Sequence, residues 1–270
     1  LFEETLEQKT EEGTRLSEIL ESKGVIPGIK VDKGAHSMEN SPSEKLTKGL
    51  DGLYDRCVGY HSLGARFAKW RAVITIGDGI PTDDCIRGNA SGLAKYAKAC
   101  QDAELVPIVE PEVLMDGVHT IETCYEVSEK TFKTVFEELE NEGVYLPGIL
   151  LKPNMVISGK DCPVQGDMNT VAEMTVKCLK ASVPEDVPGI VFLSGGQSET
   201  EATEHLNAMN AMGDCPWALS FSYGRALQQS ALRAWGGDNA NLETTYATFY
   251  HRAEMNSKAC HGEYSPELEI

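Results

Sequence analysis

Six short apolar segments, separated by helix-like stretches, constrain the fold of this chain more than any other feature. They cover residues 25–31, 65–76, 105–109, 147–151, 188–193 and 217–223, and valine, isoleucine and leucine predominate in them. Such runs are typical of strands that are buried on both faces of a parallel sheet. The alternation of strand and helix therefore predicts an α/β fold in which helices cover a parallel sheet. No linker-like stretch divides the chain, so one domain over residues 1–270 is expected.

Helical periodicity marks the stretches between these segments. Apolar residues recur at i, i+3, i+4 and i+7 in residues 84–104, 121–142 and 198–212, and an amphipathic helix is also expected over 239–260. Ser198 and Glu201 have the spacing of a capping box, which predicts a helix start at Ser198. The polar residues 261–270 are expected to form a mobile C-terminal end.

Charged residues, polar residues or glycines interrupt or directly follow each apolar segment near its carboxyl end. The positions are Lys33, Lys69, Arg71, Glu110, Glu112, Lys152, Ser194, Gly195, Gly196, Ser222, Gly224 and Arg225. One strand and one helix separate each group from the next, and the carboxyl ends of successive parallel strands meet on one face. A (β/α)₈ barrel builds its active site on that face, whereas an open sheet would spread these groups along an edge. We therefore predict a TIM (β/α)₈ barrel with an active site at this face.

Lys152 is the candidate nucleophile. It follows two leucines, and in a barrel it would share the mouth with Lys69 and Arg71. Apolar surroundings and neighbouring cations disfavour the charged form of an amine, and a neutral lysine can attack a ketone to form a Schiff base. Glu110 is then the candidate for proton transfer, with Glu112 as a supporting carboxylate.

The loops after the last two segments are suited to phosphate. The candidate donors are Ser194, Gly195, Gly196, Ser222, Gly224 and Arg225. Glycines expose backbone N–H groups without obstructing side chains, and a helix that starts behind such a loop adds its N-terminal dipole. The guanidinium of Arg225 adds a permanently charged, forked donor.

The strong negative charge limits the classes of partner. The chain has 24 basic and 42 acidic residues, a formal net charge of −18. A field of this sign repels nucleic acid and anionic membranes, so neither is expected as a partner. No segment approaches the roughly 18 apolar residues that a membrane span needs. The eight cysteines are spread without a C-x-x-C pair, which predicts reduced structural thiols.

Six runs of the sequence are similar to those of class I fructose-bisphosphate aldolases. They are GIKVDKG at 28–34, FAKWR at 67–71, VPIVEPE at 106–112, LLKPNM at 150–155, FLSGGQS at 192–198 and FSYGR at 221–225. The resemblance extends in order over almost the whole chain. It implies a lyase of glycolysis and gluconeogenesis that reversibly cleaves fructose 1,6-bisphosphate to glycerone phosphate and glyceraldehyde 3-phosphate. Metal independence and a homotetramer are implied as well.

The same resemblance implies a role for each candidate residue. Lys152 would form the covalent imine, so that no separate cofactor is required, and Glu110 would act as acid and base. Lys69 would bind the sugar hydroxyls and assist proton transfer. Lys33 and Arg71 would bind the far phosphate, which favours a bisphosphate over a monophosphate substrate. The near phosphate would be bound by Ser194, Gly195, Ser222, Gly224 and Arg225.

Two parts of the family pattern have no counterpart in these 270 residues. They are an earlier first strand that carries an aspartate, with the basic residues after it, and a C-terminal tail that ends in tyrosine. Residues 1–6 match only the end of the second strand, so we expect six complete strands and a stub, in a barrel that lacks strand 1 and part of strand 2. We expect these residues to be part of a longer, active enzyme, and to be inactive and poorly stable by themselves, since open sheet edges favour aggregation.

Other functions remain open at this point. A metal-dependent aldolase would need several histidines at strand ends, but the six histidines lie in loops or helix-like segments. Another Schiff-base sugar-phosphate lyase, or a non-enzymatic scaffold on the same fold, is an alternative. A cytoplasmic location is expected, with the plastid stroma as the other possibility.

Overall fold

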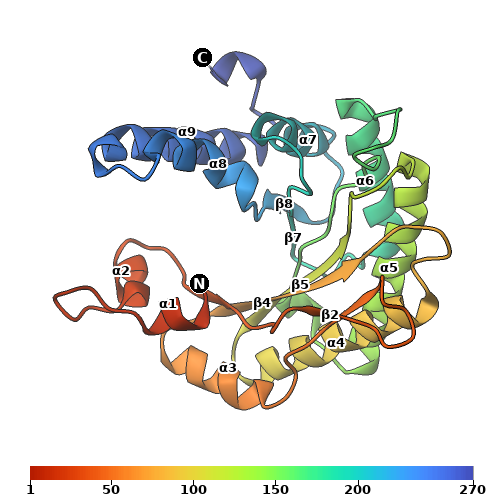
Figure 1. Ribbon diagram of the computed structural model, residues 1–270, viewed down its shortest axis with the longest axis horizontal. Coiled ribbons are helices and arrows are strands. Elements are labelled where there is room, and N and C mark those ends of the chain that lie inside the picture. Colours follow the sequence, from red (N-terminus) through yellow and green to blue (C-terminus); the bar gives the residue numbers. More distant parts are fainter. Residues whose placement is uncertain (270) are drawn as a thin grey trace. The chain divides into compact units, whose positions relative to one another are not determined.

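The computed structural model describes residues 1–269, and these fall into two units (Figure 1). Unit 1 contains Leu1–Val113, Lys130–Lys152 and Val183–Pro188, and unit 2 contains Leu114–Glu129, Pro153–Ser182 and the residues from Gly189 onward. Parallel strands followed by helices make up both units, as in the predicted (β/α)₈ barrel. The expectation that residues 1–270 form one domain stays a prediction.

Unit 1 contains four parallel strands. They are β1 (Gly28–Lys30), β4 (Phe67–Ile74), β5 (Val106–Val113) and β6 (Leu150–Leu151), paired in that order. Its helices are α1 (Glu3–Glu7), α2 (Leu16–Ser22), α3 (Leu53–Ser62) and α4 (Asp83–Asp102), with the second part of α5 (Ile121–Asn141) and the 3₁₀ helix η1 (Leu146–Gly148). Helix α4 packs against β4 and β5 (Figure 1).

Side chains alternate between the two faces of β4, as the period of a strand requires. Trp70 points to the helix side, where it is fully buried and stacks on Tyr96 of α4 with ring centroids 5.5 Å apart. The hydroxyl of Tyr96 donates to the carbonyl of Ala68 at 2.8 Å. Lys69 and Arg71 have the opposite parity and lie on the other face. Burial of one face of β4 therefore places two cations on the other.

Unit 2 contains two parallel strands, β7 (Gly189–Phe192) and β8 (Ala218–Phe221), paired from Gly189 with Ala218 to Phe192 with Phe221. Its helices are α6 (Met168–Ser182), α7 (Glu199–Ala211), α8 (Arg225–Trp235) and α9 (Leu242–Ala259), with the 3₁₀ helices η2 (Asn239–Asn241) and η3 (Pro266–Glu269). The predicted capping box is present at the start of α7, formed by Ser198 and Glu201. Within residues 1–269, none of the helices has both the length and the apolar content needed to cross a membrane.

The end of the described chain is tied to α9. Glu269 in η3 pairs with Arg252 and accepts a hydrogen bond from the hydroxyl of Tyr264 at 2.8 Å. Arg252 and Tyr264 are both buried. The expected mobility of residues 261–270 stays a prediction, and Ile270 lies outside the described residues.

The cysteines are free thiols, as predicted. Six of the eight are buried, and the others are partly exposed. The sulfur atoms of Cys57 and Cys100 lie 3.8 Å apart, well beyond the roughly 2.05 Å of a disulfide bond. These residues pack as small apolar side chains between α3 and α4.

The structure differs from the sequence-based expectation at three places. Strand β5 continues to Val113 instead of ending near Val109, because its register with β4 is unbroken and cations compensate its two carboxylates. Residues 3–7 form helix α1, not the end of a strand; only Leu1 joins β1, by backbone hydrogen bonds to Gly28 (2.6 Å) and from Lys30 (2.9 Å).

The third difference is an antiparallel hairpin that was not predicted. It is formed by β2 (Ala35–Ser37) and β3 (Lys45–Thr47), whose side chains are exposed or half-buried. Without a buried face, these strands have no apolar alternation that would reveal them in the sequence.

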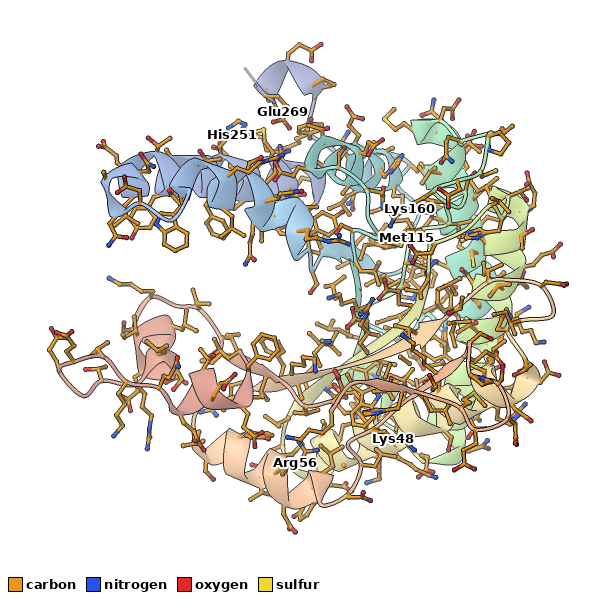
Figure 2. All side chains as sticks on the ribbon, viewed as in Figure 1. Lys48, Arg56, Met115, Lys160, His251 and Glu269 are labelled. Atoms are coloured by element: carbon orange, nitrogen blue, oxygen red, sulfur yellow. The ribbon has the colours of Figure 1, made fainter. Side chains whose placement is uncertain are left out.

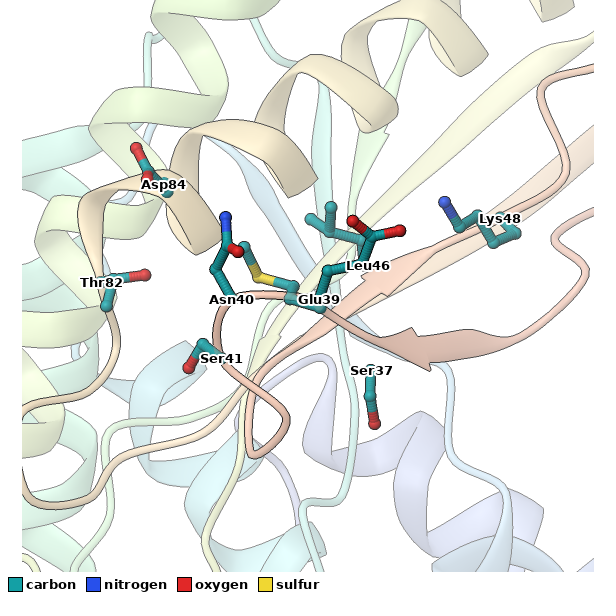
Figure 3. Close-up of a pocket in the computed structure, with 9 residues that line it drawn as sticks. Ser37, Glu39, Asn40, Ser41, Leu46, Lys48, Thr82 and Asp84 are labelled. Atoms are coloured by element: carbon teal, nitrogen blue, oxygen red, sulfur yellow. The ribbon is translucent and has the colours of Figure 1, made fainter.

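Glu44, in the loop of this hairpin, fixes the loop to the start of α4. The hairpin and the start of α4 line a hollow of about 480 Å³, with Thr82 and Asp84 on one side and Lys48 on the other (Figure 3). Glu44 is 1% exposed and accepts hydrogen bonds from the backbone N–H (2.7 Å) and the hydroxyl (2.8 Å) of Thr82. Burial opposes the charged form, but these hydrogen bonds lower the pKa of the Glu44 carboxyl.

We expect Glu44→Ala to lower the free energy of unfolding by about 1–3 kcal/mol, because it leaves two partly buried donors of Thr82 without their acceptor. Urea unfolding followed by circular dichroism measures the change. Glu39→Ala, an exposed glutamate in the same loop, is the control and should change stability by less than about 0.5 kcal/mol. Equal effects of the two substitutions would contradict the role given to Glu44.

Candidate active site

Four charged side chains of β4 and β5 share one face of unit 1. Lys69 and Arg71 are two residues apart on β4, as are Glu110 and Glu112 on β5. In the parallel register Arg71 lies opposite Glu110. Both carboxylates are almost fully buried, Glu110 at 3% and Glu112 at 5% exposure. Buried carboxylates of this kind require cationic or hydrogen-bonding partners.

Glu110 is the centre of this group. One of its oxygens lies 3.1 Å from the Nζ of Lys152, and the other lies 3.0 Å from the Nζ of Lys69. The position of Lys152 follows from the ladder, since its backbone N–H donates to the carbonyl of Val109 directly after β6 ends. Its side chain is only 13% exposed. The structure thus brings together the predicted nucleophile, the predicted proton-transfer group and Lys69.

Asp32 extends the network to a further lysine. Its carboxylate lies 2.7 Å from the Nζ of Lys30 and 3.5 Å from that of Lys69, and accepts from the backbone N–H groups of Gly34 and Arg71. Burial favours the neutral form, but the hydrogen bond from Lys30 and the charge of Lys69 lower the pKa of Asp32. Its negative charge therefore holds both lysines in place.

Arg71 and Glu112 form the second ion pair of this face, through Nε of the guanidinium. Burial disfavours the charge of Arg71, but the hydrogen bond and charge of Glu112 raise its pKa. The arginine is half exposed at its outer end, at 45% of the side chain. It can therefore still reach an anion while Glu112 fixes its inner side.

Lys33 lies apart from these contacts. Its Nζ pairs with Glu3 of α1 at 2.9 Å, and the side chain is 52% exposed. The hydroxyl of Tyr60 holds the other oxygen of Glu3 at 2.7 Å. Lys33 and Arg71 were both predicted to bind the far phosphate, but within the described residues each pairs with a different glutamate, Lys33 with Glu3 and Arg71 with Glu112.

In unit 2, the turn after β7 presents unpaired donors. Gly195 and Gly196 both have left-handed backbones, with φ of +53° and +79°. Among residues 1–269, no protein acceptor binds their N–H groups or the hydroxyl of Ser194. Consecutive free N–H groups in such a turn form a concave site for an anion.

The segment after β8 lies beside this turn. The N–H of Ser222 donates to the carbonyl of Phe192 at 2.9 Å, which continues the ladder between β7 and β8. Gly224 is the N-cap of α8, and no side chain caps the helix. Arg225, the first residue of α8, is exposed and has no partner within the described chain. The predicted phosphate donors of unit 2 thus come from two adjacent strand ends and a helix N-terminus.

The sequence prediction missed Lys30 and Asp32. Both lie near the carboxyl end of the first apolar segment, the position that also singled out Lys69 and Arg71. The same criterion would have found them. Within residues 1–269, no three His, Cys, Asp or Glu side chains gather as they do around a metal ion.

Comparison with known proteins places the chain in a family. The family described as "Fructose-bisphosphate aldolase class-I" matches residues 1–269. A probable fructose-bisphosphate aldolase class 1 of Xanthomonas axonopodis is 53% identical over 98% of this chain and 79% of that protein. The cytosolic fructose-bisphosphate aldolase 4 of Arabidopsis thaliana is 50% identical over 100% of this chain and 69% of that protein.

A solved structure is equally similar. It is the fructose-bisphosphate aldolase of Plasmodium falciparum, in a ternary complex with TRAP and a small-molecule inhibitor. The TM-score is 0.96 at 51% identity, over 98% of this chain and 77% of that one. The TIM-barrel type of fold is thereby confirmed. The chain belongs to the class I fructose-bisphosphate aldolases, a family of metal-independent lyases.

Proposed function

We propose that Lys152 forms the Schiff base through which this aldolase cleaves fructose 1,6-bisphosphate to glycerone phosphate and glyceraldehyde 3-phosphate. The observation that carries the proposal is the enclosed amine of Lys152, 3.1 Å from one oxygen of the buried Glu110. A lysine nucleophile needs a group beside it that can exchange protons during imine formation. Glu110 has that place, within hydrogen-bond distance of the amine.

The proposed reaction starts as Glu110 takes a proton from the Lys152 ammonium, and the neutral amine then attacks the ketone carbon of the sugar. Glu110 then donates a proton to the carbinolamine hydroxyl, which leaves as water, and the imine forms. The imine withdraws electrons from the adjacent carbon–carbon bond, which breaks as the neighbouring hydroxyl loses its proton to Glu110, now a carboxylate after the preceding step. The aldehyde leaves, and protonation and hydrolysis of the remaining enamine release the ketone and regenerate the amine.

In this proposal, the other charged residues of unit 1 bind the sugar hydroxyls and the far phosphate of the substrate and orient them. Lys69 binds sugar hydroxyls and assists proton transfer, with its Nζ held between Glu110 and Asp32. Glu112 supports the site by orienting Arg71 toward the far phosphate. Lys33 also serves that phosphate, for which it must exchange Glu3 for the ligand. Binding by two cations favours a bisphosphate substrate.

The near phosphate is bound by donors of unit 2 in this proposal. They are Ser194, Gly195, Gly196, Ser222, Gly224 and Arg225. Support comes from the unpaired N–H groups of the two glycines and from the uncapped N-terminus of α8. Such groups suit an anion because their partial positive charges are fixed by the backbone.

We also propose that the protein assembles as a homotetramer in the cytoplasm. The cytosolic relative from Arabidopsis supports this location over the plastid stroma. Sedimentation equilibrium and cell fractionation test the two statements, and a monomer or a plastid protein would contradict them.

Borohydride reduction in the presence of glycerone phosphate should attach the ligand covalently to Lys152, because reduction makes the imine permanent. Peptide mass mapping locates the adduct. Lys152→Met keeps the length of the side chain without its amine, and should abolish both trapping and cleavage. Lys95→Met, at an exposed lysine of α4, is the control and should leave both unchanged. An adduct at another lysine would overturn the assignment.

Glu110→Gln should reduce kcat by about 10²- to 10⁴-fold, because the amide keeps the shape of the side chain but cannot exchange protons. Steady-state kinetics with fructose 1,6-bisphosphate measures the loss, and circular dichroism shows whether the fold is kept. Glu112→Gln is the matched comparison, since it removes a similarly buried carboxylate that contacts Arg71 instead of Lys152. Equal losses in kcat would argue against a specific role in proton transfer.

A further inference from the structure

The glycine turn of unit 2 needs support that its two glycines do not provide. Gly195 and Gly196 are consecutive and both left-handed, and glycine has more backbone freedom than any other residue. An anion site made of backbone N–H groups works only if these groups are already oriented together. Some feature around the turn must therefore restrict it.

Packing on one side of the turn is incomplete. A hollow of about 310 Å³ is lined by Gly195, Gly196, Met115, Lys160 and His205, among others. Met115 and Lys160 lie close together there (Figure 2) and approach Gly196 so closely that a Cβ would lie 2.7 Å and 3.0 Å from their Cε atoms. These are flexible side chains beside a cavity, and they restrict the turn less than a solid core would.

Hydrogen bonds from Gln197 hold the turn instead. Its backbone N–H and its side-chain Nε2 both donate to the carbonyl of Ser194, each at 2.9 Å. A carbonyl can only accept, so the Nε2 of Gln197 faces it and the Oε1 points the other way. That Oε1 meets the Nδ1 of His205.

His205 is a residue of α7 that reaches back to the turn. It is 9% exposed, and burial lowers its pKa although the charge of Glu201 acts in the opposite direction. The neutral ring carries one proton, and the Oε1 of Gln197 is an acceptor, so that proton is on Nδ1. His205 therefore donates to Gln197, which donates to Ser194.

We propose that His205, acting through Gln197, is a positioning residue that keeps the turn 194–197 in its anion-binding conformation. The inference rests on the proposed phosphate-binding role of this turn. Without the Nδ1 donor, only the Nε2 end of Gln197 is held, by the Ser194 carbonyl and by the sulfur of Met155 at 3.5 Å. The side chain can then turn toward the weaker sulfur acceptor, and the Ser194 carbonyl loses one of its two donors. The free N–H groups of Gly195 and Gly196 then spread over several orientations, and phosphate binds more weakly.

The test compares His205→Leu with His205→Asn. Leucine lacks a donor, whereas the amide nitrogen of asparagine lies near the place of Nδ1 and can restore the bond to Gln197. Loss of a hydrogen bond of ordinary strength corresponds to a change of about three- to tenfold. We expect His205→Leu to raise the KM for fructose 1,6-bisphosphate and the Kd for inorganic phosphate by that factor, with kcat changed less than about twofold. His205→Asn should stay close to the parent protein.

Two further variants keep the test decisive. Methionine in Gln197→Met has a similar length but cannot form the side-chain hydrogen bonds. This variant should therefore match His205→Leu, and the double variant should be no worse than either single one. His261→Leu, at an exposed histidine, is the control and should change nothing. Unchanged KM and Kd in His205→Leu, or equal defects in the leucine and asparagine variants, would overturn the proposal.

Ser194→Ala separates this inference from the proposed phosphate site. If Ser194→Ala weakens phosphate binding and His205→Leu does not, the positioning role is wrong and the phosphate site stands. If neither variant changes the Kd for phosphate, the turn is not the phosphate site, and the positioning role falls with it. Borohydride trapping at Lys152 tests the Schiff base independently of both results.

Discussion

The contact of Glu110 with two lysines is the interaction on which the proposed chemistry of unit 1 depends. A carboxylate that is 3% exposed is strongly unfavourable without compensation, and Lys152 and Lys69 provide it at 3.1 Å and 3.0 Å. The same geometry places the proposed acid–base group beside the proposed nucleophile. The stability of the buried charge and the proposed role of Glu110 in proton transfer therefore have one structural origin.

Strand periodicity makes this arrangement possible. One face of β4 is committed to the core, where Trp70 and Tyr96 stack, and this leaves the other face for Lys69 and Arg71. The parallel register then sets Glu110 next to Arg71, and the ladder places Lys152 after β6. In unit 2, the ladder between β7 and β8 likewise aligns two groups of free N–H donors. The backbone sets the charged residues and the donors in their places, and the packed core face keeps them there.

Much of the site could be predicted because each residue directly interrupts or follows an apolar run. Lys69, Glu110 and Lys152 were selected in this way, and the structure brings them into contact. Lys30 and Asp32 were missed, although they also interrupt or follow an apolar run, that of residues 25–31. The direct partner of Lys33 could not be predicted, because Glu3 belongs to a helix 30 residues earlier in the chain and pairs with Lys33 only through tertiary contact.

The sequence by itself determined the α/β alternation, the helix that starts with a capping box at Ser198, and the polar residues near the strand ends. These features are local, since propensity and periodicity act over a few residues. The tertiary structure decided where β5 ends, that residues 35–47 form a hairpin, and that Gln197 connects His205 to the glycine turn. Pairing between distant strands and the partners of buried polar groups decide such features, and a single sequence does not display those contacts.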